Sequence, residues 1–113
     1  MSRAWITMAV AAAAFLSPQY GNALSPQSGD SMDRGRVLAQ RMCSECHAVQ
    51  PGQVVSPNPF APSFEQVANT RGMTSAALWS WLHTSHRNMP NIILHPDETR
   101  AIVSYILTLQ DVD

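Results

Sequence analysis

The chain contains no lysine: arginine supplies all seven basic residues, and charged residues make up only 13% of the 113 positions. A typical soluble domain carries about 25% charged residues. A net charge of −1 excludes a general nucleic-acid binder, because phosphate binding needs a basic surface. Two cysteines are too few for a disulfide-dense small domain. The length allows one domain.

The most apolar run stands at the start of the chain. Arg3 precedes thirteen largely apolar residues, 4–16, and Gly21-Asn22-Ala23 offers small residues at the two positions that a signal peptidase reads. This pattern predicts a signal peptide over residues 1–23, cleaved after Ala23, and export to the periplasm. An uncleaved anchor is the alternative, but a membrane span needs roughly 17–25 apolar residues. We therefore expect no membrane span after cleavage.

Removal of the signal peptide leaves one domain over residues 24–113, with six arginines, eight acidic residues and a net charge of −2. So short a chain buries only a modest core. It would gain stability from a large apolar prosthetic group packed at its centre.

A helix is expected to follow an unstructured lead-in over residues 24–30. Asp30 or Ser31 fits its N-cap, with Asp33 in its first turn. Its apolar face predicts which residues it packs: Gly35, Leu38, Ala39, Met42, Cys43 and Cys46. We interpret the arginines between them, Arg34, Arg36 and Arg41, as a solvated face.

Residues 48–62 contain four prolines and predict an extended loop. A short helix over residues 64–68 should follow, with Ser63 and Gln66 spaced as a capping box. Thr74 fits the N-cap of the next helix.

The last helix has the clearest start, since Pro96 fits its first position and Asp97 and Glu98 suit its positive end. Its buried stripe would comprise Ala101, Ile102, Tyr105, Ile106 and Leu109. No alternating strand pattern competes with these helices. The sequence therefore predicts an all-α fold of about four helices and long loops.

The segment with the clearest chemical role is Cys43-Ser44-Glu45-Cys46-His47. The pattern C-x-x-C-H is the attachment signature of c-type haem. Two thiols one helical turn apart reach the two vinyl groups of a haem, and the adjoining His47 becomes the proximal iron ligand. A redox dithiol would open a helix of a βαβ unit, and a structural zinc site would want a second cysteine pair. The sequence predicts one covalently bound haem c.

The other axial ligand decides what the iron does. Candidates after the motif are Met73, His83, His86, Met89 and His95. Met89 precedes Pro90 and follows a polar run, so it lies on a constrained loop and not in a helical stripe, where a core methionine would stand. Methionine opposite histidine gives a closed iron suited to electron transfer. We expect Met89; His86, His83 and an open position remain alternatives.

These pieces together resemble class I cytochrome c, the small monohaem kind of bacterial electron-transport chains. The resemblance extends over residues 24–113. It rests on Gly35-x-x-Leu38, Cys43-Ser44-Glu45-Cys46-His47, Ala61-Pro62-Ser63-Phe64, Asn88-Met89-Pro90-Asn91 and the closing helix around Ala101-Ile102-x-x-Tyr105-Ile106.

The resemblance implies the cytochrome c fold, wrapped around one covalently attached haem. The first and last helices would cross, with Gly35 allowing Tyr105 to approach. An aromatic residue usual near Ala39 is missing here, so Leu38 would fill that contact or the contact would be smaller.

The same resemblance implies further cofactor contacts. The carbonyl oxygen of Pro62 would accept a hydrogen bond from His47 Nδ1, and Trp79 or Trp81 would donate to a haem propionate. Arg87, beside the ligand loop, would pair with a propionate or border the docking surface. We interpret His83, His86 and His95 otherwise as loop or surface residues.

The expected function is that of an exported one-electron carrier that catalyses nothing by itself. Its partners would be transient redox proteins of the dehydrogenase, oxidase or reaction-centre type, and the carrier a monomer. One alternative is a haem enzyme or sensor in which Met89 detaches and iron handles peroxide, nitrite or nitric oxide. Another is a permanent cytochrome subunit of a dehydrogenase or oxidase complex.

Overall fold

The computed structural model describes residues 28–111, and the expected signal peptide lies outside them. Within this range the chain forms four α-helices and no strand: α1 (Ser28–Met42), α2 (Phe64–Ala68), α3 (Ser75–His83) and α4 (Pro96–Leu107). The expected all-α fold is confirmed. None of these described helices is long and apolar enough to span a bilayer.

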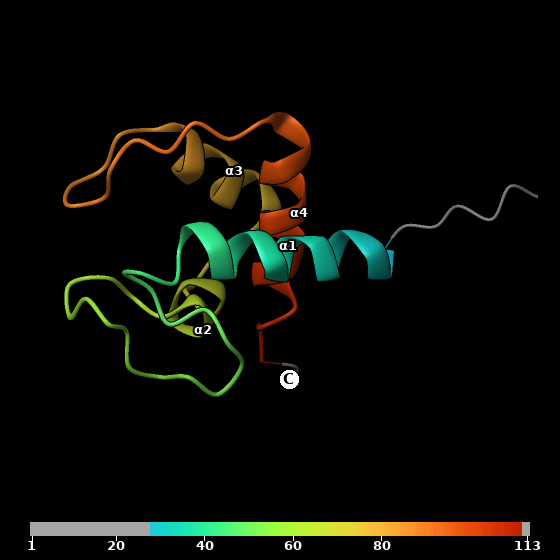
Figure 1. Cartoon of the computed structure of the whole chain (residues 1–113). Helices are drawn as coiled ribbons and strands as arrows, with labels where there is room; N and C mark the ends of the chain where they lie inside the picture. Colours follow the sequence, from blue (N-terminus) through green and yellow to red (C-terminus); the bar gives the residue numbers. More distant parts are fainter. Residues whose placement is uncertain (1–27, 112–113) are drawn as a thin grey trace, which may run out of the picture.

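Helix α4 is the centre of the fold, because it packs against each of the other three helices and most extensively against α1. Figure 1 shows the two helices crossing, with α2 and α3 to either side of α1. A Cβ atom at Gly35 would lie 2.0 Å from the carbonyl oxygen of Ala101 and 2.8 Å from Tyr105 Cβ. The close approach expected at Gly35 is therefore confirmed.

The missing aromatic residue in this contact is replaced by small and aliphatic side chains. Ala39 is fully buried in the core, and Leu38 packs against the core from a half-buried position. The stripe predicted on α4 is buried as expected at Ala101, Ile102, Tyr105 and Ile106, and Val103 is buried as well. The fifth predicted residue, Leu109, lies beyond the end of the helix and is half-buried.

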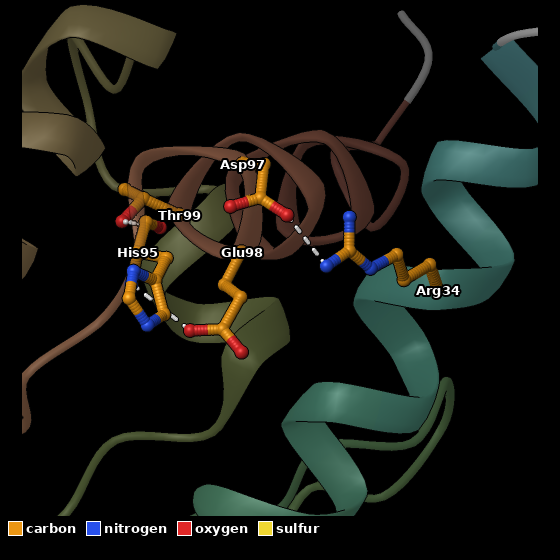
Figure 2. A network of polar contacts seen from close by, with 5 residues as sticks. All are labelled: Arg34, His95, Asp97, Glu98 and Thr99. Atoms are coloured by element: carbon orange, nitrogen blue, oxygen red, sulfur yellow. Dashed lines mark hydrogen bonds and ion pairs between the residues drawn. The ribbon is translucent and has the colours of Figure 1, made fainter.

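An ion pair joins the amino-terminal halves of the two crossing helices (Figure 2). Arg34 donates to Asp97 at 2.6 Å, and this guanidinium lowers the pKa of the Asp97 carboxyl group. The start of α4 is fixed beside it. The Glu98 carboxylate accepts the backbone N–H of the N-cap residue His95 at 2.9 Å, and the Thr99 hydroxyl donates to the His95 carbonyl oxygen.

The predicted start of α1 was wrong. The helix begins at Ser28, so neither Asp30 nor Ser31 is its N-cap, and Asp30 is the acidic residue of the first turn. A carboxylate there is stabilised by the positive end of the helix without being its cap. Asp33 lies one turn further along and accepts from Arg36 at 3.4 Å.

The predicted caps of α2 and α3 are both confirmed. The Ser63 hydroxyl accepts the N–H of Gln66, whose side chain accepts the N–H of Ser63 in return. The Thr74 hydroxyl accepts the N–H of Ala77 at 3.2 Å.

Residues 48–62 form the expected loop without helix or strand. Two backbone bonds hold this loop in place. Asn58 donates its N–H to the carbonyl oxygen of Cys46, before the loop, at 3.1 Å, and Phe64, at the start of α2, donates to the Ala48 carbonyl oxygen at 2.9 Å. Tyr105 adds a buried bond from α4, donating its hydroxyl to the Val49 carbonyl oxygen at 2.6 Å. The loop therefore holds the residues after α1 against α4.

Candidate cofactor site

The two cysteines occupy a turn that continues directly from α1. The N–H of Cys43 donates to the Ala39 carbonyl oxygen at 2.9 Å, and the N–H of His47 donates to the Cys43 carbonyl oxygen at the same distance. This helical turn brings Cys43, Cys46 and His47 to one side of the chain. Both thiols are free, Cys43 buried and Cys46 half-buried.

Burial raises the pKa of the Cys43 thiol to about 11. The thiol therefore stays neutral near pH 7, whereas a redox dithiol needs a thiolate with a lowered pKa. The raised pKa of Cys43 therefore gives the dithiol alternative no support. Among residues 28–111 no group of three or more histidine, cysteine, aspartate or glutamate side chains is placed to bind a metal ion, and the zinc alternative finds no support either.

His47 is fixed by the loop that follows it. Its Nδ1 atom lies 2.7 Å from the Pro62 carbonyl oxygen, the bond that the resemblance to cytochrome c implies. A carbonyl oxygen only accepts, so Nδ1 carries the hydrogen and Nε2 of the neutral ring keeps a lone pair. The Phe64 ring packs against the imidazole, with centroids 5.6 Å apart. Such bonding to the other ring nitrogen orients a metal-binding histidine and makes it more basic.

A cavity of about 500 Å³ lies beside this turn, and every helix contributes to its walls. The carboxyl end of α1 and the tip of the loop between α3 and α4 lie on the same side of the helix crossing (Figure 1). Apolar side chains form most of the lining: Met42, Phe60, Phe64, Val67, Met73, Leu78, Trp81, Leu82, Ile92 and Ile106. The size is within the range of small-molecule and cofactor sites.

Met89 reaches this cavity from a tight turn. Its N–H donates to the His86 carbonyl oxygen at 3.4 Å, and Asn88, the third residue of the turn, has a φ of 66°. This left-handed backbone conformation is tolerated by asparagine better than by most residues with a side chain. Ser85 closes the loop by donating its hydroxyl to the Asn91 side chain at 2.9 Å. Met89 itself is half-buried against the cavity.

His86 lies in the loop between α3 and α4, as expected, but it is not a fully exposed surface residue. It is half-buried and lines the cavity, with its Nε2 atom 2.9 Å from the Met89 sulfur. Met73 also lines the cavity, packed against the core between α2 and α3. His83 and His95 are exposed and outside the cavity lining, as expected. The turn that bends residues 86–89 back on themselves is what moves His86 inward.

The two tryptophans of α3 point to different places. Trp81 lines the cavity and is 54% exposed. Trp79 stacks on His83, with centroids 4.7 Å apart, and lies in a shallow depression beside Arg100 and Val103 of α4. Residues two apart on a helix point about 200° away from each other. Trp79 therefore does not line the cavity, and a hydrogen bond from either tryptophan to a haem propionate stays a prediction.

Two exposed charged residues lie at the cavity wall, Glu45 after α1 and Arg87 in the α3–α4 loop. Arg87 thus lies at the cavity wall, and its expected pairing with a propionate or with a partner stays a prediction. With one charge of each sign, this wall carries no strong field.

The cavity fits a c-type haem in the nature of its groups. The apolar lining suits a porphyrin, and the residues that line it include two free thiols, the His47 imidazole with Nδ1 bound to a carbonyl oxygen, and the Met89 thioether. Thiols form the thioether links, and imidazole with thioether is an axial pair of c-type iron.

Comparison with known families agrees with a site for c-type haem. The family model for cytochrome c matches residues 32–110, which include all four helices except the first four residues of α1. A search of curated proteins found no match, and a search of solved structures found none. The matched family binds haem c covalently through cysteines, and Cys43 and Cys46 stand in that motif. The fold, the cysteine motif and the family match together place the chain in the cytochrome c family.

Proposed function

We propose that the chain is an exported one-electron carrier with a single haem c. The haem would be attached through Cys43 and Cys46, with its iron between His47 and Met89. The observation that carries this proposal is the convergence of these four side chains on one apolar cavity. Membership of the cytochrome c family supports the haem and the electron transfer.

The bound haem supplies the reversible gain and loss of one electron at its iron. His47 and Met89 would hold that iron: Pro62 orients the His47 ring, and the turn ending at Met89 brings the thioether to the cavity. Thioether ligation raises the reduction potential. The apolar lining excludes water, so little solvent has to reorganise when the charge changes.

The partners of such a carrier would be redox proteins that bind only transiently. Phe60 and Trp81 line the cavity and are also exposed, 82% and 54% respectively. We therefore propose an apolar contact patch around these two rings, with Arg87 as its main charged residue. A dehydrogenase, oxidase or reaction-centre protein with an apolar electron-exit surface would fit it, and the carrier would remain a monomer.

The test is production of the full chain in a bacterium that attaches haem to c-type proteins. We expect red protein in the periplasmic fraction that keeps its haem after denaturation and acid–acetone extraction. The ferric protein should show the near-red band of sulfur-to-iron charge transfer, and the ferrous protein should not bind carbon monoxide readily.

Matched variants assign these signals to residues. Cys43→Ala with Cys46→Ala should remove the covalent haem, and Met89→Ala should remove the band while the haem stays attached. Colourless wild-type protein would contradict the haem, and ready carbon monoxide binding by the wild type would favour the enzyme or sensor alternative.

A further inference from the structure

The His86 imidazole and the Met89 thioether lie side by side in the cavity wall. The atoms His86 Nε2 and Met89 Sδ are 2.9 Å apart, and both residues are half-buried. Their backbones form the two ends of one turn, joined by the bond from the Met89 N–H to the His86 carbonyl oxygen. The turn therefore offers two side chains that bind iron, within one small displacement of each other.

Each ring nitrogen of His86 faces an atom that can only accept. Its Nδ1 lies 3.0 Å from the Thr84 carbonyl oxygen, and its Nε2 lies 2.9 Å from Met89 Sδ. A neutral ring has one N–H, so it donates to one of these two atoms at a time; with the hydrogen on Nδ1 it donates to Thr84 and has a lone pair on Nε2, the form that binds a metal. His47 has a carbonyl partner at the same ring position, since its Nδ1 is bound to the Pro62 carbonyl oxygen. A backbone carbonyl on the other ring nitrogen is what orients metal-binding histidines.

The ring is also held by packing. Trp81 contacts it edge to face, with centroids 5.1 Å apart and planes at 81°. His83 serves as an internal comparison: its Nδ1 lies 2.8 Å from the Trp79 carbonyl oxygen, yet it is exposed and does not line the cavity. His86 thus combines a carbonyl partner at Nδ1 with a place in the cavity wall, whereas His83 has the carbonyl partner alone.

We propose that His86 is a second distal ligand for the cofactor iron, taking the place of Met89 whenever the thioether is removed or displaced. This inference rests on the proposed function, because it presumes a haem in the cavity. The exchange moves no electron: with the ring hydrogen on Nδ1, donated to the Thr84 carbonyl oxygen, the Nε2 lone pair would replace a sulfur lone pair on the metal, and the thioether would leave uncharged. The distance involved is of the order of the 2.9 Å between Nε2 and Sδ.

The oxidation state of the iron should bias the exchange. A thioether raises the reduction potential relative to a second imidazole. By linkage, the imidazole then competes better for ferric iron than for ferrous iron. His86 therefore binds preferentially in the oxidised protein, and reduction favours the return of Met89 where the thioether is intact.

The test compares three holoprotein variants that lack the thioether: Met89→Ala alone, Met89→Ala with His86→Ala, and Met89→Ala with His83→Ala as the matched control. We expect ferric Met89→Ala to be low-spin with two imidazole ligands by EPR, and the His83 control to be the same. The variant without His86 should be high-spin or hydroxide-bound, with a higher potential than Met89→Ala.

Binding of free imidazole gives a second readout. If His86 occupies the iron in nine-tenths of the molecules, imidazole binds Met89→Ala about tenfold more weakly than the variant lacking His86. Imidazole should also return that variant to a low-spin spectrum, which shows that its cavity is intact. Circular dichroism of each variant reports whether the helices are retained.

Two results would overturn the inference: a Met89→Ala spectrum that is high-spin, or one that does not change when His86 is removed. A persistent sulfur-to-iron band in Met89→Ala would assign the iron to Met73 instead and also contradict it. Failure of the proposed function has a different signature, namely wild-type protein without haem or without the band. The wild-type iron could already show two imidazole ligands, one of which disappears in His86→Ala. That result would contradict Met89 as the resting ligand and would support His86 as a ligand.

Discussion

Gly35 lies so close to Ala101 that a Cβ atom would come within 2.0 Å of the Ala101 carbonyl oxygen. This contact between α1 and α4 has no flexible side chain that could yield, since the nearest atoms are backbone atoms and Tyr105 Cβ. The helix crossing therefore depends on the absence of a side chain at one position.

Gly35→Ala should destabilise the protein. Alanine normally stabilises a helix relative to glycine by about 0.5–1 kcal/mol, but here the backbones must move apart, and we expect a net loss of about 2–3 kcal/mol. Denaturant unfolding of the ferric holoprotein measures it. Gly29→Ala in the same helix is the control, because nothing lies within 4 Å of its Cβ position; it should stay within about 1 kcal/mol of wild type. Equal effects at both positions would contradict the close contact.

Asn88→Val should loosen the turn that holds Met89, whereas Asn88→Gly should leave it nearly unchanged. Glycine adopts the φ of 66° seen at Asn88 without strain, but a side chain branched at Cβ raises the energy of this backbone conformation by roughly 1–2 kcal/mol or more. The sulfur-to-iron band of the ferric protein is the readout, followed against temperature. The argument fails if the valine variant keeps the band to the same temperature as wild type.

Tyr105→Phe should lower the free energy of unfolding by about 1–2 kcal/mol, because the buried Val49 carbonyl oxygen loses the hydroxyl that donates to it. The loss should depend on pH. Burial raises the pKa of Tyr105 above its ordinary value of 10.0, so the folded state holds this proton more tightly than the unfolded state.

The stabilisation by Tyr105 is therefore fully present below pH 10 and is lost as pH rises through the raised pKa. No lysine titrates in this window, because the chain has none. Unfolding free energies of wild type and Tyr105→Phe, measured on both sides of pH 10, should converge at high pH. A constant difference would show that ionisation of Tyr105 plays no part.

Alkaline solution should not place an amine side chain on the iron. Lysine often replaces methionine at high pH in cytochromes c that carry it, but this chain contains none, and arginine stays protonated. Raising the pH of ferric protein should retain Met89 longer than in lysine-bearing relatives and then yield hydroxide or histidine ligation. The near-red band and low-temperature EPR follow the titration. An amine-ligated species that survives acetylation of the terminal amine would refute this.

Electron exchange should depend only mildly on salt. Exposed Glu45 and Arg87 at the cavity wall oppose each other in sign, and steering of a partner scales with complementary charge. The rate of self-exchange between ferric and ferrous copies, measured by NMR line broadening, provides a test that needs no named partner. A steep change in rate between low and physiological ionic strength would reveal a charged docking surface that we do not expect.

Much of the fold follows from local rules that the sequence displays. The cap residues Ser63 and Thr74 and the proline at the start of α4 were predicted correctly. Each cap hydroxyl accepts the N–H of the residue three positions on, and a proline at the first helical position lacks an N–H that would otherwise have no partner in the helix. The start of α1 was missed because Ser28 and Asp30 both fit a helix terminus, and spacing alone does not choose between them.

The site was predictable in its chemistry but not in its packing. The cysteine motif and Met89 stand out in the sequence, whereas the inward position of His86 depends on a left-handed residue, Asn88, in the turn between them. The spacing His86-x-x-Met89 before a proline was the available signal for that turn. Likewise, the choice between Trp79 and Trp81 depends on the rotation of α3 about its axis, which two residues of similar character do not reveal.

The most extensive helix pairing joins α1 and α4, the first and last helices of the described chain. This pairing makes closure of the fold depend on both ends of the described chain at once. The crossing at Gly35 cannot form without Ala101 and Tyr105 of α4, and Cys43 lies in the same buried cluster as Ile102 and Ile106. An exported chain whose α4 has not yet docked would therefore leave Cys43 open to an attaching enzyme. On the proposed function, docking of the last helix would then cover a cysteine that already carries its cofactor.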